Sequence, residues 1–386
     1  MWLLTKFLLL WCLLQSMLFW PSSLYPRPWL LVLAALILLV FNHKKIFTSN
    51  IPIIGLFIST LLIIFDSIII SGIIPTLAIA STYFAGFCLY RMKESLKIDL
   101  LNFVTKWFGI IIGISLTAYV IWLITDYPPF SILHEPYGYS NHRNFIFFIL
   151  SQTNLEITRF SGPFIEPGHL GTIAVFILYA NKFEFKTNRY LWFILTAVLF
   201  SLSLAGYVLL ALAYILYRGV NPKHVASIAI FLLLIYYGST ELWNRGDNPV
   251  NEKIIERLQY DDEKGISGNN RSLYSTDLYF AKMVKDRSII WGLGNKQNNE
   301  LLEKKKIGGA GITIYLIYNG IIGLILVLTY YFAIAYNSID RKFSYGFFIL
   351  ICFCFLQRAY PFWMAWLIPY ISSISIQKRK SVVLSV

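Results

Sequence analysis

Two segments of the sequence combine ionisable side chains with a position beside an apolar stretch, and the first comprises residues 159–169. It reads Arg-Phe-Ser-Gly-Pro-Phe-Ile-Glu-Pro-Gly-His and continues directly into an apolar run. Because proline suits the first turn of a helix, we expect a helix that begins at Pro167. Glu166 then lies beside the helix N-terminus, with an extended backbone because a proline follows it. Backbone amides at this terminus, with the Arg159 guanidinium nearby, are suited to bind an oxyanion or a phosphate.

The same residues also have a purely structural interpretation. Glu166 would then only be a partner of the helix dipole or of Arg159, and Arg159 and His169 would be an interface anchor and a hydrogen-bonded surface residue. In the chemical interpretation Glu166 is the general base if partial burial raises the pKa of its carboxyl group. His169 is the alternative base, because imidazole has the more suitable ordinary pKa. Gly162 and Pro167 would shape the substrate site around them.

The second segment begins with Asn270, Arg271 and Tyr274, and it ends with Trp-Gly-Leu-Gly at residues 291–294. Arg271 would supply a second cation for a diphosphate, and Asn270 and Tyr274 would bind the substrate beside it. The glycines would let the backbone approach a ligand, or would simply form a turn. The structural alternative is that Arg271 is a solvated side chain in a charged loop.

Three further polar residues are candidates for substrate binding. His142 and Arg143 lie in an earlier loop that mixes aromatic and polar residues, and Arg358 interrupts the last long apolar stretch. No cofactor and no metal is expected, because the pair of Cys352 and Cys354 has no histidine or further cysteine beside it. The predicted chemistry therefore depends on carboxylate, imidazole and guanidinium groups.

The composition indicates what surrounds these residues. The chain of 386 residues is 57% hydrophobic and 14% charged, and its apolar runs are too many for a soluble core to bury. The net charge of +13 would suggest nucleic acid in a soluble protein. Here the basic residues lie mainly in short links between apolar runs, where they determine membrane topology. The sequence therefore predicts a polytopic integral membrane protein with no nucleic-acid partner.

Apolar segments long enough to cross a membrane follow one another along the chain. The first lacks a small-residue cleavage site and is expected to stay as an uncleaved span. The region 190–217 is either one long span or a hairpin of two short helices, and only the hairpin places all six clusters of basic residues on one face of the membrane. The other expected spans are residues 2–20, 28–42, 46–66, 69–90, 101–125, 167–182, 224–240, 309–336, 343–357 and 361–376.

The predicted fold is an all-α polytopic helical membrane protein with about twelve transmembrane helices and both termini in the cytoplasm. Residues 1–386 would form a single membrane domain, in which residues 126–166 and 241–308 are two larger external loops. Helices that stop short, at the turn 201–206 and at Arg358, predict a polar funnel open to the outside.

The second loop contains a stretch, residues 271–287, with the spacing of an amphipathic helix. We expect this helix to lie over the mouth of the funnel. The apolar side chains that are spaced like one helical face are Leu273, Leu278, Ala281 and Val284.

Together these motifs resemble those of the superfamily of O-antigen polymerases (Wzy-type) and O-antigen ligases. Its members typically have about ten or more spans, an Arg-x-x-Gly-x-Phe-x-(Glu/Asn)-Pro-like stretch entering a helix, and a large later periplasmic loop. The chain matches that stretch at residues 159–167. Further similarities are the turn 201–206, Arg271 before Trp-Gly-Leu-Gly at 291–294, and Gly-Ile-Ile-Gly at 320–323.

One departure discriminates within the superfamily. Its ligases resemble one another in a histidine followed by Asn, Ser or Gln about eleven residues before the last glycine pair. Gly309 and Ala310 hold that place here, and residues 241–308 contain no histidine. The departure argues against an O-antigen ligase and favours a repeat-unit polymerase.

The resemblance implies a glycosyltransferase that moves a glycan chain from undecaprenyl diphosphate to a sugar hydroxyl of another lipid-linked repeat unit. The reaction would take place on the outer side of the bacterial cytoplasmic (inner) membrane. Arg159 and Arg271 would bind the diphosphate, and Glu166 would deprotonate the acceptor hydroxyl. The implied partners are the undecaprenyl-diphosphate-linked oligosaccharides, membrane lipid and a chain-length regulator protein, with no cofactor.

Two other classes of function stay open on the sequence alone. About twelve spans also suit a lipid-linked oligosaccharide flippase or another transporter, although such proteins more often show internal repeats and ionisable residues near the membrane midplane. A non-catalytic scaffold would tolerate substitution of the arginines in the external loops.

The expected topology generates a first prediction, for cysteines introduced at Ser267 and Asn298. In a variant without the native cysteines, both should react with a membrane-impermeant thiol reagent in intact cells, because the hairpin at 190–217 places the second loop outside. A cysteine at Lys186, in an expected cytoplasmic link, is the control and should react only after the membrane is opened. Labelling of the first two positions only in opened cells would contradict this topology.

Overall fold

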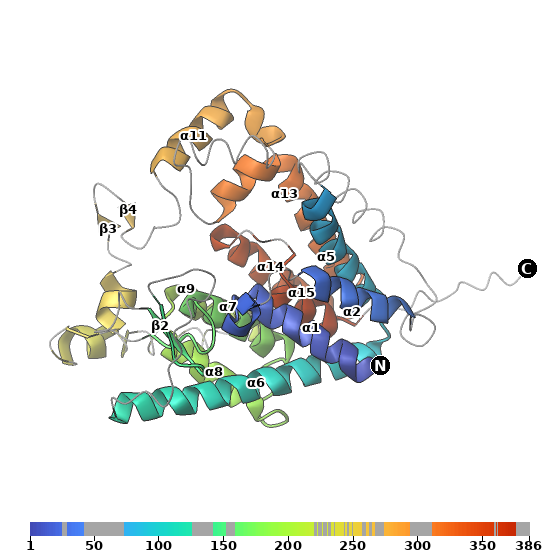
Figure 1. Ribbon diagram of the computed structural model, residues 1–386. Coiled ribbons are helices and arrows are strands. Elements are labelled where there is room, and N and C mark those ends of the chain that lie inside the picture. The colour runs from blue at the N-terminus through green and yellow to red at the C-terminus, as the bar shows by residue number, and fades with distance from the viewer. Residues whose placement is uncertain are drawn as a thin grey trace, which may run out of the picture.

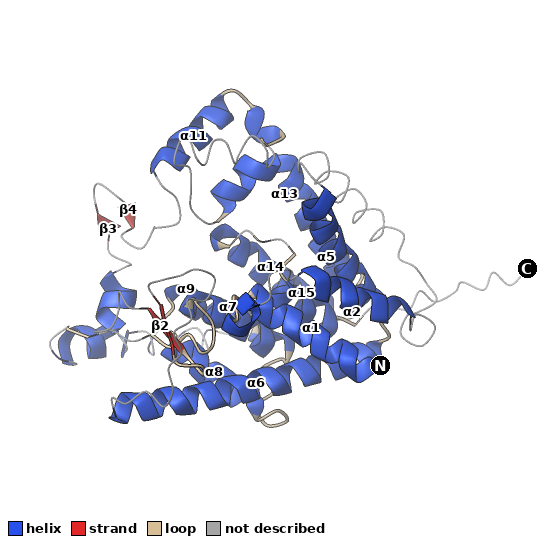
Figure 2. Cartoon of the chain, viewed as in Figure 1, coloured by secondary structure: helices blue, strands red, loops and turns tan. Residues whose placement is uncertain are grey.

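The computed structural model describes residues 1–24, 29–41, 73–125, 142–151, 159–219, 274–293, 311–358 and 362–375, with Tyr360 and isolated positions between 222 and 266. This part of the chain is mostly helical, in agreement with the all-α class, and its strands form two short pairs (Figure 1; Figure 2). The expected span 46–66 and about half of the expected span 224–240 lie outside the described residues.

The apolar stretches form helices close to their expected limits. Within the described ranges, α6 and α13 are long and apolar enough to cross a membrane, as judged by length and composition. The long helices are α1 (Trp2–Ser16), α2 (Trp29–Phe41), α5 (Ile73–Arg91), α6 (Glu94–Thr125), α7 (Pro167–Ala180), α8 (Tyr190–Phe200), α9 (Leu204–Arg218), α11 (Tyr274–Lys285), α13 (Ile312–Tyr336), α14 (Arg341–Gln357) and α15 (Met364–Ser373).

The region 190–217 forms two helices, α8 and α9, joined by a turn, and not one long helix. The chain turns through Leu202, whose φ of 44° is in the left-handed region. Ser203 then caps α9, because its hydroxyl accepts a hydrogen bond from the Gly206 amide at 3.3 Å. This bond satisfies one of the amide donors that a helix start leaves unpaired.

α7 is the central helix, and each residue from His169 to Ala180 is buried. It packs against α8, α9 and α15. Where α7 crosses α9 the backbones meet, since a Cβ placed on Gly206 would lie 3.2 Å from the Gly171 Cα. Small residues permit this close approach of two helices. The crossing also brings Ser201 and Ser203 of the α8–α9 turn against the first turns of α7.

The described part of the first predicted loop is built into the helical bundle. β1 (His142–Asn144) pairs antiparallel with β2 (Ile149–Ser151), and the Phe148 ring lies 5.7 Å from the Tyr119 ring of α6. β3 (Tyr260–Asp261) and β4 (Gly265–Ile266) form a second antiparallel pair, within the second loop.

The segment that leads into α7 is held by backbone hydrogen bonds to three other parts of the chain. The Ile149 amide donates to the Gly162 carbonyl, and the Trp20 amide donates to the Pro163 carbonyl. On the remaining side, the Phe160 amide donates to the Phe200 carbonyl at the end of α8. Gly162 has a φ of 56°, a conformation that suits glycine. The path of the chain into Glu166 is therefore fixed by its surroundings.

The helix predicted for residues 271–287 is present as α11, and the side chain it buries against the rest of the chain is not one of the four apolar residues that are spaced like one face. Leu278 and Val284 are 55% and 51% exposed, whereas Met283 is buried. Met283 packs with Ile289 and with Ile317 of α13. The chain reverses at Arg287, whose φ is 63°, and returns onto α13. The path of the chain after Arg287 determines which face of α11 is covered. The spacing of apolar residues within α11 cannot predict that face.

α13 is interrupted at Gly320, where φ is 67° and ψ is −178°. The turn that follows η8 (Ser288–Ile290) contacts this break. A Cβ on Gly320 would lie 2.5 Å from the Ile290 carbonyl oxygen, and one on Gly292 would lie 2.5 Å from the Tyr318 carbonyl oxygen. Both positions therefore require glycine, and two glycine motifs distant in the sequence meet here.

Gly320→Ala should destabilise the protein much more than Gly113→Ala. The backbone at Gly320 is in a region that essentially only glycine adopts, at a cost of about 1 to 3 kcal/mol for other residues, and the added methyl group also meets backbone atoms. A Cβ on Gly113 would meet only the Phe193 ring, at an ordinary contact distance of 3.4 Å. Thermal unfolding of the two purified variants in detergent measures the difference. Equal melting temperatures would contradict the described geometry of the break.

Candidate functional site

Glu166 lies at the N-terminus of α7, as the sequence predicts. It is the N-cap residue, with extended backbone angles of φ −115° and ψ 124°, and Pro167 begins the helix. Its main-chain carbonyl accepts the first hydrogen bond of the helix, from the His169 amide at 3.0 Å. Its side chain makes no capping hydrogen bond to the helix amides, so the carboxylate is directed elsewhere.

The Glu166 carboxylate forms an ion pair with Arg358, which the sequence had suggested only for substrate binding. Arg358 Nη2 donates to Glu166 Oε2 at 2.9 Å. The Arg358 side chain is 5% exposed and that of Glu166 is 45% exposed. Gly168 makes room for the guanidinium, because a Cβ there would lie 2.6 Å from Nη2. A buried cation thus holds a carboxylate that stays accessible from one side.

His169 is the third member of this group. Its Nε2 lies 3.6 Å from Glu166 Oε2, and the imidazole is buried. The ring packs edge-to-face on Trp363, with centroids 5.0 Å apart, and Trp363 stacks on Tyr360. The imidazole therefore lies close enough to Glu166 to share a proton with the carboxylate after a small movement.

Arg159 contacts the α8–α9 turn at the edge of this group. Its Nε donates to the Ser201 carbonyl oxygen at 3.2 Å, and the side chain is half-buried. The hydrogen bond supports a turn that lies against α7 through Ser203. Arg159 is thus fixed beside the site, while Arg358 provides the guanidinium that contacts Glu166.

The remaining predicted site residues are placed only in part. The backbones of His142 and Arg143 lie in β1, and that of Tyr274 begins α11, while their side chains are outside the description. Asn270 and Arg271 lie outside the described residues. Within the described ranges, no three His, Cys, Asp or Glu side chains gather as ligands for a metal ion.

Two features of the site were missed by sequence reasoning. Trp363 orients His169, and its only signal was its position just after the break at Arg358 in an apolar stretch. Gly168 accommodates the Arg358 side chain, and its adjacency to Pro167 suggested only the start of a helix. The role of each follows from a contact made across the fold.

The arrangement can bind and orient, and it can also accept a proton. The guanidinium fixes the Glu166 carboxylate while one side of it stays accessible, and a general base needs such a fixed position within reach of the proton it takes. Glu166 is the most exposed member of the trio with His169 and Arg358, so it is the member most accessible to a ligand. Comparison with protein-family models, with curated proteins and with solved structures found no match to this chain. The geometry and the resemblance of the motifs are therefore the basis for a functional proposal.

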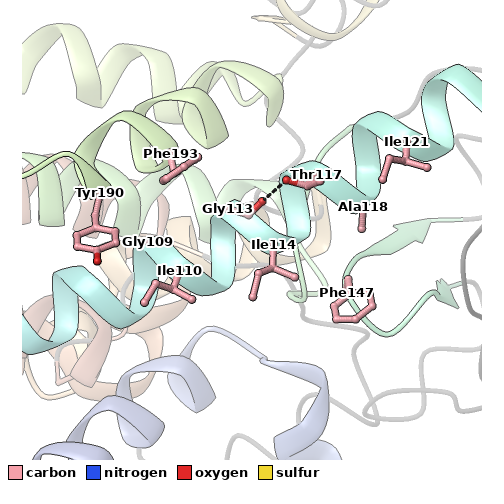
Figure 3. Close-up of a pocket in the computed structure, with 10 residues that line it drawn as sticks. All are labelled: Gly109, Ile110, Gly113, Ile114, Thr117, Ala118, Ile121, Phe147, Tyr190 and Phe193. Atoms are coloured by element: carbon pink, nitrogen blue, oxygen red, sulfur yellow. Dashed lines mark hydrogen bonds between the residues drawn. The ribbon is translucent and has the colours of Figure 1, made fainter.

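An apolar groove runs along α6 and the start of α8 (Figure 3). Its volume is about 490 Å³. Gly109 lies against the start of α8, since a Cβ there would lie 2.7 Å from the Tyr190 Cβ. At the other end, Phe147, from the link between β1 and β2, lines the groove together with Ala118 and Ile121 (Figure 3). That link leads to Ile149, which is hydrogen-bonded to the segment before Glu166.

The ion pair should appear as a coupling energy in a double-mutant cycle. For Glu166→Ala and Arg358→Ala we expect a coupling of about 1 kcal/mol, reduced by solvent screening because the carboxylate is half-exposed. Glu184→Ala with Arg358→Ala is the matched control. Glu184 lies beyond the far end of α7, a helix of about 21 Å, so those changes should be additive within about 0.5 kcal/mol. Unfolding free energies in a denaturing detergent titration provide the measurement, and equal coupling in both cycles would argue against the pair.

Proposed function

We propose that this chain is a polysaccharide repeat-unit polymerase, a glycosyltransferase whose donor is a glycan on undecaprenyl diphosphate. The acceptor is a sugar hydroxyl of a second lipid-linked repeat unit. The protein would be a multi-pass protein of the bacterial cytoplasmic membrane, with about twelve spans, both termini in the cytoplasm and the reaction on the outer side.

The observation that supports this proposal most directly is the accessible Glu166 carboxylate, held at a helix N-terminus by the buried Arg358 guanidinium. Transfer to a hydroxyl group needs a base that is ionised, fixed in position and open to the acceptor. The same region contains the Arg-x-x-Gly-x-Phe-x-Glu-Pro stretch that resembles the polymerases. The α8–α9 turn, which also belongs to that resemblance, packs against the start of the same helix.

The reaction proceeds by attack of the acceptor oxygen on the anomeric carbon of the donor. A bond forms between these atoms as the bond from the anomeric carbon to the diphosphate oxygen breaks, and undecaprenyl diphosphate leaves with the electron pair. The hydroxyl proton passes to Glu166. Arg159 and Arg271 stabilise the charge on the leaving diphosphate. Arg358 keeps the carboxylate oriented, and His169 stands beside it as the alternative base.

The groove along α6 and α8 suits the lipid part of the donor. It is lined largely by apolar side chains and glycines, which match an isoprenoid chain. One end lies at the link between β1 and β2. That link continues into Ile149 of β2, which is hydrogen-bonded to Gly162 on the approach to Glu166.

Glu166→Gln should abolish polymer formation while donor binding persists. Loss of a general base lowers turnover by at least about a hundredfold, and the amide keeps the shape of the side chain. The test uses purified protein and a lipid-linked repeat unit across a range of pH, with Glu184→Gln as the control for an exposed acid. If Glu166→Gln stays active and His169→Ala does not, the imidazole is the base.

Arg159→Ala should also abolish chain lengthening without removing the protein from the membrane. Lysine should restore little activity, because it keeps the charge but loses the planar fork that binds a diphosphate.

Deletion of the gene distinguishes the three classes of function. Loss of a polymerase leaves single repeat units attached to the surface, loss of a ligase leaves none attached, and loss of a flippase stops display. Normal-length polysaccharide from Arg159→Ala at native expression would remove Arg159 from the mechanism.

A further inference from the structure

The segment that follows α11 presents a large aromatic side chain to its surroundings. Trp291 is 66% exposed, and Ile290 before it is 39% exposed. An indole ring combines a large apolar surface with a polar N–H group, and such rings prefer the boundary between a bilayer and water. The position of this segment along the length of α13 therefore determines whether Trp291 contacts acyl chains, headgroups or water.

The backbone of the segment is fixed to the break in α13. The Leu293 amide donates to the Ile317 carbonyl oxygen at 2.9 Å, and Gly292 meets the backbone of Tyr318 and Gly320. These contacts involve main-chain atoms on both sides, so Trp291 cannot slide along α13 without breaking them. Non-helical backbone within a membrane helix is tolerated where protein covers it in this way.

The docking point lies near the outer end of α13, within the expected span 309–336. About 20 helical residues cross the roughly 30 Å of hydrocarbon. Counting about this number back from Tyr336, the last residue of α13, and across the break at Gly320, leads to Ile317. Leu293 is bonded to that residue, so Trp291 lies near the level at which α13 enters the headgroup region.

The end of α11 adds cations at the same place. Lys282 and Lys285 occupy its last turn, and both are exposed, as is Arg287. The Asp286 carboxylate is hydrogen-bonded within the turn: it accepts hydrogen bonds from the Ser288 amide at 3.0 Å and from the Ser288 hydroxyl at 2.6 Å. Long basic side chains beside an aromatic ring suit the phosphates of lipid headgroups.

We propose that Trp291 and the basic end of α11 are seated in the headgroup layer of the lipid bilayer and anchor the second loop to the membrane surface. The indole ring lies at the boundary of the acyl chains, and Lys282, Lys285 and Arg287 reach the phosphates. This inference depends on α13 crossing the membrane, and it is independent of the polymerase reaction.

Fluorescence quenching tests this position in the full-length protein, reconstituted in nanodiscs of phosphatidylcholine and phosphatidylglycerol. The native cysteines are replaced, and a bimane label is attached to Trp291→Cys or, in a second variant, to Ile290→Cys. Lipid with a headgroup nitroxide should quench both labels roughly threefold more than aqueous iodide, because only an interfacial position brings the label within reach of that nitroxide. Activity is not part of the measurement.

Two control positions calibrate the result. A label at Ile325, exposed in the middle of α13, should respond to a nitroxide placed deep in the acyl chains, and one at the exposed Glu256 should respond to iodide. Trp291 and Ile290 labels that behave like the Glu256 label overturn the proposal. So do labels shielded from all quenchers, a result that would indicate contact with another protein or a second copy of the chain.

Discussion

The ion pair between Glu166 and Arg358 is the interaction on which the arrangement of the site depends. A guanidinium that is only 5% exposed has to be paired, because an isolated charge inside an apolar bundle costs several kcal/mol or more. The structure meets this requirement by bringing the end of α14 to the first turn of α7. Gly168 leaves space for the guanidinium, and the crossing at Gly171 lets α9 come near without displacing it. The N-terminus of α7 is therefore a place where close backbone packing and charge pairing support each other.

Features that depend on neighbouring residues could be predicted from the sequence. Proline at position 167 determined where α7 begins and why Glu166 is extended, since proline restricts both its own backbone and that of the residue before it. The break between α8 and α9 was expected at a local Ser/Gly turn, residues 201–206, although the choice of two helices also used basic residues along the whole chain. The existence of α11 followed from its apolar spacing. For α7 and α11 the determining interactions lie within a few residues of the feature.

Features that depend on distant partners could not be predicted in this way. Arg358 is 192 residues from Glu166, and nothing near either residue specifies the other. The buried face of α11 depends on how the chain after Arg287 returns to α13. The contact between Gly292 and Gly320 joins two motifs that the sequence showed only as separate similarities. Such contacts arise from the packing of whole helices against one another. The local pattern of residues is only one of several factors that determine this packing.

The separation between Glu166 and Arg358 also has a consequence for biogenesis. At synthesis rates of about 5 to 20 residues per second, Arg358 emerges roughly 10 to 40 s after Glu166. During that interval α7 can already be inserted and packed on α9, but its terminal carboxylate has no guanidinium to meet. The ion pair is thus completed only when the end of α14 arrives, and a chain that stops before Arg358 would contain most of the bundle without the guanidinium that pairs with Glu166. The ion pair that fixes Glu166 therefore forms late in the synthesis of the chain.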